Sequence, residues 1–285
     1  MITKSENNTI AFTADLFDIG QTLTCGQCFR FTENGGVYTI KAFGKTINIK
    51  QHGNRFELSP ATPQDFRSIW EPYFDLTADY AEIQHKLSAD PVMRRAIDFA
   101  PGIRILQQEK WETLISFIIS QNNNIPRIKS IIERLCEKYG DGAFPSPDAL
   151  CAAGVDRLSS CGTGFRSKYI HDASSRVLSG EIDLDALKTL PASEIKETLK
   201  KIKGVGDKVA DCVILFAYKK TDAFPIDVWV KKIMEHFYFN GEPVRIEEIR
   251  AKAHALFGEY GGYAQQYLFH YARNCLKASS AASKE

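Results

Sequence analysis

The alternation of apolar and polar residues changes character near residue 60. Between Val37 and Leu58 the two classes alternate in VYTIKAF, KTINIKQ and RFELS. Glycine and asparagine at residues 34–36 and 53–54 supply turns. A period of two is typical of strands with one buried face. The pattern therefore predicts an antiparallel meander over residues 37–58.

Beyond Pro60 the apolar residues recur with helical spacing. Thr62 before Pro63 is typical of an N-cap with proline in the first helical turn. The predicted fold class is α+β, in which a small N-terminal antiparallel β-sheet domain with helices is followed by an all-α domain. The spacing predicts helices at residues 63–70, 77–87, 90–98, 110–121, 125–139, 146–152, 167–178, 192–201, 207–219, 227–238, 246–257 and 262–274.

The length of 285 residues, with 44% hydrophobic content, allows a sizeable core and about two domains. We expect a mixed domain over residues 1–98 and a helical domain over 99–275, although the first helices could pack on either. Residues 276–285 carry too little apolar surface to offset their ordering entropy, so we expect a disordered tail.

Composition excludes some classes of protein and leaves others open. The net charge of +1 gives no sign of a polyanionic partner, so a nucleic-acid site must come from local clustering. The seven cysteines are scattered and no charged-then-apolar leader opens the chain, so we expect free thiols in a reducing cytoplasm. The apolar runs are far shorter than the ~20 residues that cross a bilayer, so we expect no membrane partner.

A short glycine-rich stretch, KGVGDKVADC at residues 203–212, joins two predicted helices. Gly204, Val205 and Gly206 would form the turn of a helix-hairpin-helix, whose exposed amides and helix N-terminus bind a phosphate. A C-cap glycine plus a simple turn is the alternative. Residues 199–220 carry six lysines and two aspartates, a local charge of +4, which favours phosphate binding.

Lys208 sits in the first turn of the second predicted helix, where the helix dipole disfavours a cation. The same environment favours the free amine, which is the nucleophilic form of lysine. Asp227, in AFPIDVWVKKI, precedes another apolar-periodic run and is an expected N-cap. A carboxylate fixed in this way can also stabilise a developing positive charge.

Several motifs together carry a resemblance to a known family. One of these motifs is the hairpin LKKIKGVGDKVADC, which is followed by PID. The others are CGQCFRF, YFDLTADYAEI, ISQNNNIPRIKSIIERLC, GTGFRSKYI and GYAQQYLFHYARN. Together they cover nearly the whole chain, in the order expected of that family. The chain resembles the helix-hairpin-helix DNA glycosylases, and among them the 8-oxoguanine DNA glycosylases with AP lyase activity. The resemblance implies an all-α helix-hairpin-helix glycosylase domain after the sheet domain.

The resemblance also implies a substrate, a mechanism and a set of residues. The partner would be double-stranded DNA with 8-oxoguanine opposite cytosine, bound by a monomer without a metal or cofactor. Lys208 would attack the sugar C1′ and form an imine that permits β-elimination, with Asp227 stabilising the charge. The implied contacts to the base are Gly26, Cys212, Gln265 and Phe269, and those to the rest of the DNA are Asn122, Arg127, Phe165, Arg166, Gly204, Val205 and Gly206.

Alternatives exist at both the residue and the protein level. Taken singly, these residue types also serve core packing, helix capping or turns. Trp229 and Phe165 depart from the family's usual histidine and tyrosine, and the closely spaced C-terminal cysteines of the iron–sulfur branches are absent, which excludes those branches. Cys25 and Cys28 form a lone pair, too little to indicate a metal. An alkylated-base DNA glycosylase and a non-catalytic helix-hairpin-helix duplex-binding protein are the competing functions.

Overall fold

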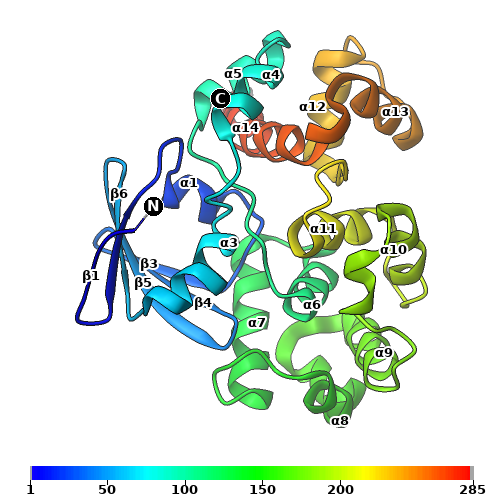
Figure 1. Ribbon diagram of the computed structural model, residues 1–285. Coiled ribbons are helices and arrows are strands. Elements are labelled where there is room, and N and C mark those ends of the chain that lie inside the picture. The colour runs from blue at the N-terminus through cyan, green and yellow to red at the C-terminus, as the bar shows by residue number, and fades with distance from the viewer. Residues whose placement is uncertain (1, 283–285) are drawn as a thin grey trace.

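The computed structural model describes residues 2–282 and begins with a six-stranded antiparallel sheet in the order β1-β2-β6-β5-β4-β3 (Figure 1). The predicted meander is confirmed as β4, β5 and β6. β1, β2 and β3 were not predicted. The edge strands β1 and β3 expose nearly every side chain and so lack alternation, and β2 alternates over only five residues. The strands are β1 (Ile2–Glu6), β2 (Thr9–Thr13), β3 (Phe31–Asn34), β4 (Val37–Ala42), β5 (Lys45–His52) and β6 (Arg55–Ser59).

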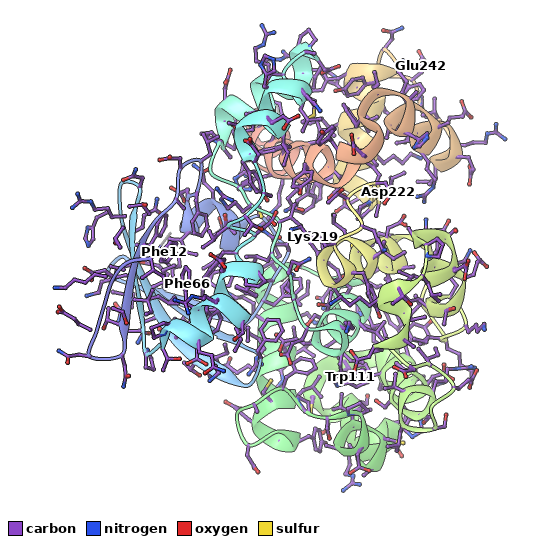
Figure 2. The ribbon with its side chains drawn as sticks, in the orientation of Figure 1. Phe12, Phe66, Trp111, Lys219, Asp222 and Glu242 are labelled. Atoms are coloured by element: carbon purple, nitrogen blue, oxygen red, sulfur yellow. The ribbon has the colours of Figure 1, made fainter. Side chains whose placement is uncertain are left out.

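One face of the sheet packs on short helices and forms a core of its own. Phe12 on β2 contacts Phe66 with ring centroids 5.0 Å apart, and Figure 2 shows the two rings between sheet and helix. The expected cap at Thr62 is confirmed, since its hydroxyl accepts from the amide of Asp65 in a capping box. The helices on this core are α1 (Ile19–Thr24), α2 (Pro63–Asp65), the π-helical η1 (Phe66–Trp70) and α3 (Glu71–Tyr73).

The rest of the described chain is helical, as the spacing predicts. Its helices are α4 (Tyr80–Leu87), α5 (Pro91–Phe99), α6 (Lys110–Ser120), α7 (Ile125–Tyr139), α8 (Pro147–Leu158), α9 (Ser167–Leu178), α10 (Ala192–Leu199), α11 (Asp207–Tyr218), α12 (Val228–Tyr238), α13 (Ile246–Phe257) and α14 (Gly261–Ala282). Short η segments lie at Ser159–Thr163, Gly164–Arg166, Ala186–Thr189 and Gly258–Tyr260.

The helices α4 and α5 pack in the helical core rather than on the sheet. Tyr80, Leu87 and Met93 belong to the same buried cluster as α6, α11 and α14, and Figure 1 shows α5 beside α14. The expected division at residue 98 grouped these helices with the sheet, and the packing differs from that expectation. The sequence could not decide this because both cores offer apolar surface. The extent of each domain stays a prediction.

Two helix ends differ from their predicted positions. α8 continues to Leu158, and its predicted end at residue 152 lies just before Gly154, where a φ of +71° interrupts the helix. α14 continues to Ala282, although we expected disorder from residue 276. Alanine and lysine in this stretch favour helix whatever their apolar content, which explains the difference. Residues 283–285 of the expected tail lie outside the described residues.

Candidate active site

The predicted helix-hairpin-helix is formed by α10 and α11, and its two glycines serve different purposes. Gly204 has a φ of +78°, and a Cβ there would lie 2.3 Å from the ring of Tyr169, so both its backbone and its surroundings require glycine. Gly206 has an ordinary φ of −99° and open space around it. Val205 is buried and donates its amide to Ile202, so its N–H is used within the hairpin.

Charge is less concentrated at the hairpin than the local count of +4 indicates. Lys219 lies at the opposite end of α11, roughly 16 Å from Lys208 at 1.5 Å per residue. There it forms an ion pair with Asp75, and Figure 2 shows Lys219 near the centre of the molecule. Lys200 pairs with Asp207 at 3.1 Å. The expected cluster of six lysines is therefore wrong, because sequence proximity along a helix does not gather charge at one end.

Lys208, in the first turn of α11, points toward α6. Its Nζ donates to the Oγ of Ser120 at 3.1 Å and lies 5.1 Å from the ring centroid of Phe117. Both partners belong to α6, which packs against α11. The amine is therefore half-buried beside an aromatic face, with the hydroxyl of Ser120 and the sulfur of Cys212 as its side-chain partners.

Asp227 is the N-cap of α12, as the sequence predicts. One carboxylate oxygen accepts from the amides of Trp229 at 3.0 Å and Val230 at 2.8 Å. Burial raises the pKa of this carboxyl, while the Val230 amide and the charge of Lys208 lower it. The coupling to Lys208 means that α11 and α12 present an amine and a carboxylate to the same region of the molecule.

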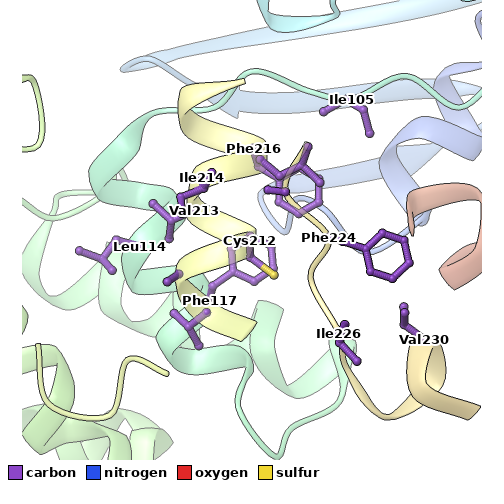
Figure 3. Packing of buried hydrophobic residues seen from close by; sticks show 14 of the residues in the cluster. Ile105, Leu114, Phe117, Cys212, Val213, Ile214, Phe216, Phe224, Ile226 and Val230 are labelled. Carbon is purple, nitrogen blue, oxygen red and sulfur yellow. The ribbon is translucent and has the colours of Figure 1, made fainter. Parts of the chain in front are cut away.

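Cys212 lies one turn after Lys208 on α11 and is only 3% exposed. Figure 3 shows its sulfur near Phe117, between α11 and the segment that carries Phe224 and Ile226. Burial raises the pKa of the thiol to about 12, so the group is a neutral thiol at physiological pH. Cys212 therefore forms an uncharged wall beside the lysine.

Gly26 follows α1 in a turn that reaches from the sheet core to α14. Its φ is +86°, and a Cβ would lie 2.9 Å from the ring of Phe269. The turn is fixed from both sides: Gln27 donates to the carbonyls of Thr22 and Arg104. Gln266 on α14 donates to the carbonyl of Cys25 at 2.7 Å. The backbone of this turn is thus rigid where it meets α14.

A cavity of about 50 Å³ lies where these parts meet, and we call it the lesion pocket. The Oε1 of Gln265 is buried there without a hydrogen-bond partner among the described residues. A buried acceptor without a hydrogen bond costs free energy of folding. Its position in the wall of a cavity indicates that a ligand donates a hydrogen bond to it. The lining residues are Gly26, Phe117, Lys208, Cys212, Phe216, Pro225, Asp227, Gln265, Gln266 and Phe269.

The polar loop between α6 and α7 lies beside Arg166. Asn122 is exposed with a φ of +47°, and Asn124, rather than Asn122, caps α7. Arg166 is 3% exposed and donates to the backbone carbonyls of Gln121, Asn122 and Thr163. The buried guanidinium thus holds the backbone of this loop in place.

Arg127 and Phe165 lie on the surface near this loop. Arg127 is exposed in the first turn of α7. Burial lowers the pKa of Arg166, and the charge of the nearby Arg127 lowers it further. Phe165 is 51% exposed, unusually so for a large apolar side chain, and its ring lies 4.4 Å from the guanidinium carbon of Arg166. An exposed ring above a basic loop is suited to contact with nucleic-acid bases.

The structure brings six predicted residues to the lesion pocket: Gly26, Lys208, Cys212, Asp227, Gln265 and Phe269. The hairpin, the Asn122 loop and Phe165 lie outside its lining. Sequence reasoning missed Ser120, Phe117 and Gln266. Gln266 had a signal, since it adjoins Gln265 in the helix, whereas the partners from α6 are far away in sequence.

The described residues contain no group of three or more histidine, cysteine or acidic side chains that could hold a metal ion. The thiols of Cys25 and Cys28 are both buried, and burial raises the pKa of Cys25 to about 12. No helix within residues 2–282 combines the length and the apolar character needed to span a membrane.

Two family models match the sequence of the chain in tandem. Residues 9–114 match the N-terminal domain of 8-oxoguanine DNA glycosylase. Residues 115–258 match the HhH-GPD superfamily of base excision DNA repair proteins.

Relatives and solved structures agree with these matches. A Clostridium acetobutylicum 8-oxoguanine glycosylase/lyase, in complex with dsDNA containing cytosine opposite 8-oxoG, is 40% identical with a TM-score of 0.91, covering 96% of this chain and 97% of that one. MBOgg1, bound to a low-affinity DNA ligand, is 43% identical with a TM-score of 0.92, covering 95% and 97%. The probable N-glycosylase/DNA lyase of Methanothermobacter thermautotrophicus is 31% identical over 232 residues, 71% of this chain and 73% of the relative.

Proposed function

Because the chain belongs to the 8-oxoguanine DNA glycosylases of the HhH-GPD superfamily, we propose that it is a bifunctional DNA repair enzyme. It excises 8-oxoguanine from double-stranded DNA that carries cytosine opposite the lesion, and then cleaves the strand as an AP lyase. The observation that supports this most directly is the lesion pocket, where an amine, a carboxylate and an unsatisfied amide oxygen converge.

In our proposal the damaged nucleotide leaves the duplex and enters the lesion pocket. Flipping costs a few kcal/mol of unstacking, which contacts in the pocket must offset. The pocket of about 50 Å³ is far smaller than the roughly 300–1,000 Å³ of small-molecule sites, so its walls must separate for a base to enter. Phe269 is only half-buried, so its ring is the wall with space to move.

Lys208 is the proposed nucleophile. Its neutral Nζ attacks C1′, and the bond from C1′ to the base breaks with its electron pair leaving on the base. One amine proton passes to the departing base, and the other passes to the sugar O4′ as the bond from C1′ to O4′ breaks, which gives an imine. Loss of a proton from C2′ then expels the 3′ phosphate by β-elimination. Ser120, as the hydrogen-bond acceptor of the amine, would orient it before attack.

Asp227 is the proposed electrostatic partner of this step. Positive charge develops on the sugar as the base departs, and a fixed carboxylate stabilises it without reorganising. The two amides of α12 hold the carboxylate in one position. The coupling between the charges of Asp227 and Lys208 supports the pairing.

Recognition of the base is proposed to rest on Gly26, Gln265, Cys212 and Phe269. The N7 of 8-oxoguanine carries a hydrogen where guanine has a lone pair, so the Gly26 carbonyl accepts from the damaged base and repels the normal one. Gln265 offers its free oxygen to the pairing edge of the base. Cys212 and Phe269 flank the ring from two helices.

The opposite strand is proposed to meet the loop after α6. Asn122 fills the gap left by the base and Phe165 wedges into the stack. Arg127 and Arg166 hold the orphaned cytosine, with the exposed Arg127 better placed for direct contact because Arg166 already donates to the loop carbonyls. The hairpin of Gly204, Val205 and Gly206 is proposed to contact a phosphate through backbone amides other than that of Val205, which donates to Ile202. We further propose a monomer that acts on DNA in the cytoplasm, associated with the nucleoid.

One experiment tests the proposal directly. Wild type and Lys208→Gln are incubated with a duplex that carries 8-oxoguanine opposite cytosine, in the presence of borohydride. We expect wild type to release the base and form a trapped covalent adduct. The Gln variant should bind the duplex but do neither, because the amide is similar in length and is not a nucleophile. Lys201→Gln, an exposed lysine of the same hairpin, is the matched control and should retain both activities.

The outcomes separate the competing functions. A borohydride adduct that persists in Lys208→Gln would contradict the assignment of the nucleophile. Base release from wild type without any adduct would indicate a glycosylase that uses water, as expected of an alkylated-base enzyme. Binding of the wild type without base release would indicate a non-catalytic DNA-binding protein.

A further inference from the structure

Arg273 lies on the pocket-facing side of α14, and none of the roles proposed above uses it. It follows Phe269 by one turn and Gln266 by two, so all three share one face of the helix. Gln266 on this face holds the carbonyl of Cys25, and Phe269 contacts the Gly26 turn. The register thus places Arg273 at the outer edge of the lesion pocket.

The guanidinium of Arg273 has no bonded partner among the side chains that the structure describes. Among the residues whose side chains the structure describes, it has no hydrogen bond and no ion pair at 4.0 Å or less. Burial lowers its pKa, and the groups that raise it are Cys25 and Asp227. Cys25 is a neutral thiol, and Asp227 already accepts two amides as a helix cap.

Burying part of a cation without a partner costs free energy. Such a cation beside a pocket therefore indicates that a ligand brings an anionic group to it. The neighbouring cations differ in this respect. Lys208 donates to Ser120, and Arg166 donates to backbone carbonyls. Arg273 is thus a half-buried cation at the pocket whose donors are all still available within the described side chains.

We propose that Arg273 binds a backbone phosphate of the DNA at the mouth of the lesion pocket and so holds the flipped nucleotide. This inference rests on the proposed function, because the DNA supplies the phosphate. A guanidinium presents paired donors that match two phosphate oxygens. The polar edge of the base faces Gln265 and Gly26 inside the pocket, whereas Arg273 lies one turn beyond Phe269, where the sugar and phosphate remain.

The test measures binding, so it does not depend on catalysis. Wild type, Arg273→Gln and Arg273→Lys are titrated with an undamaged duplex and with one carrying a tetrahydrofuran abasic site, at several salt concentrations. We expect Arg273→Gln to weaken binding of the abasic duplex roughly 10-fold and to reduce its salt slope by about 0.9, the value for one phosphate contact. Arg273→Lys should restore part of both. Arg55→Gln, which changes an exposed arginine on the sheet, should alter neither.

Single-turnover excision at saturating enzyme distinguishes this role from support of Asp227. A phosphate contact predicts a rate within a few-fold of wild type once binding is saturated. An unchanged salt slope, or a large loss of the saturated rate with unchanged binding, would overturn the proposal. Failure of the proposed function is separately visible, because the wild type itself would then show no preference for the abasic duplex.

Discussion

Asp227 illustrates how one side chain meets two requirements that oppose each other. As the cap of α12 it satisfies two amides, which stabilises the fold. As a buried carboxylate it is held where water solvates it poorly, and its pKa is raised. Asparagine would serve the cap equally well and avoid the cost of burying a charge. The fold alone therefore does not require aspartate here, which is consistent with the role that we propose for Asp227 at the pocket.

This reasoning predicts the effect of Asp227→Asn. Excision under single turnover should fall by two or more orders of magnitude, because the fixed charge is lost. The raised pKa means that wild type loses stability as pH rises through that pKa, while the variant does not. The variant should therefore unfold at an equal or higher temperature at neutral pH. Wild-type excision should decline on acidification at a pH above the usual range for aspartate.

Thermal melts and excision rates between pH 4 and pH 8 check both statements. Asp79→Asn, which changes the exposed cap of α4, is the matched control and should leave excision unchanged. Clear destabilisation of Asp227→Asn at neutral pH would show that the carboxylate serves the fold.

Resemblance located six of the residues that line the lesion pocket, but the partners of these residues depend on packing that no local sequence pattern contains. Ser120 and Phe117 meet Lys208 only because α6 packs on α11. Arg273 belongs to no site motif that the sequence indicates, and it stands out only because the described side chains offer it no partner. The resemblance implies that Arg166 contacts DNA, whereas in the fold Arg166 donates to backbone carbonyls of the loop between α6 and α7.

At the scale of elements, substitution of each of the two glycines in the α10–α11 hairpin should affect a different property of the protein. Gly204→Ala should destabilise the protein by about 1–3 kcal/mol, because alanine disfavours the positive φ and its Cβ meets Tyr169. Gly206→Asp should leave the melting temperature unchanged or raise it, since aspartate is a good N-cap in open space. It should nevertheless weaken binding to every duplex, because it places a negative charge where a phosphate is expected.

Gly206→Asn is the matched control, since it keeps the cap and the shape without the charge. Melting curves and binding to damaged and undamaged duplexes at two salt concentrations provide the measurements. Equal affinity for Gly206→Asp and Gly206→Asn would rule out a phosphate at this helix N-terminus.

Helices with several turns and a clear apolar stripe were predictable to within a few residues, as at α7 and α13. Elements that are short or exposed were not, because α1, β1 and β3 contain too few positions to display a period. The end of α14 was mispredicted for a different reason. Apolar content determines whether a segment packs, but not whether a helix already formed continues through alanine and lysine.

For the whole molecule, the pocket lies where the sheet core and the helical core meet. The Gly26 turn comes from the sheet side, while the catalytic candidates come from α11, α12 and α14. Arg30 and Glu112 connect the two sides by an ion pair at 2.9 Å. The alignment of the pocket therefore depends on contacts between the cores, of which this buried pair is one.

Glu112 makes this junction sensitive to pH. Burial raises the pKa of its carboxyl to about 7, although Arg30 opposes the shift. The pKa of this carboxyl is thus higher in the folded protein than in the unfolded chain, where it is about 4.5. The protonated carboxyl therefore contributes its full stabilisation of the fold below pH 4.5, and this contribution is lost as pH rises toward 7. Glu112→Gln keeps an oxygen for Arg30 but does not ionise.

The variant should therefore gain stability relative to wild type between pH 4.5 and pH 7, by up to about 1.4 kcal/mol per pH unit. Denaturant unfolding of both proteins across pH 4.5–8 measures this difference, with Glu57→Gln on the exposed face of β6 as the control. A constant difference over the range would mean that Glu112 titrates normally. If instead the wild type becomes more stable relative to the variant as pH rises, the attraction of Arg30 for the ionised carboxylate outweighs the cost of burying its charge. The ion pair would then strengthen the junction.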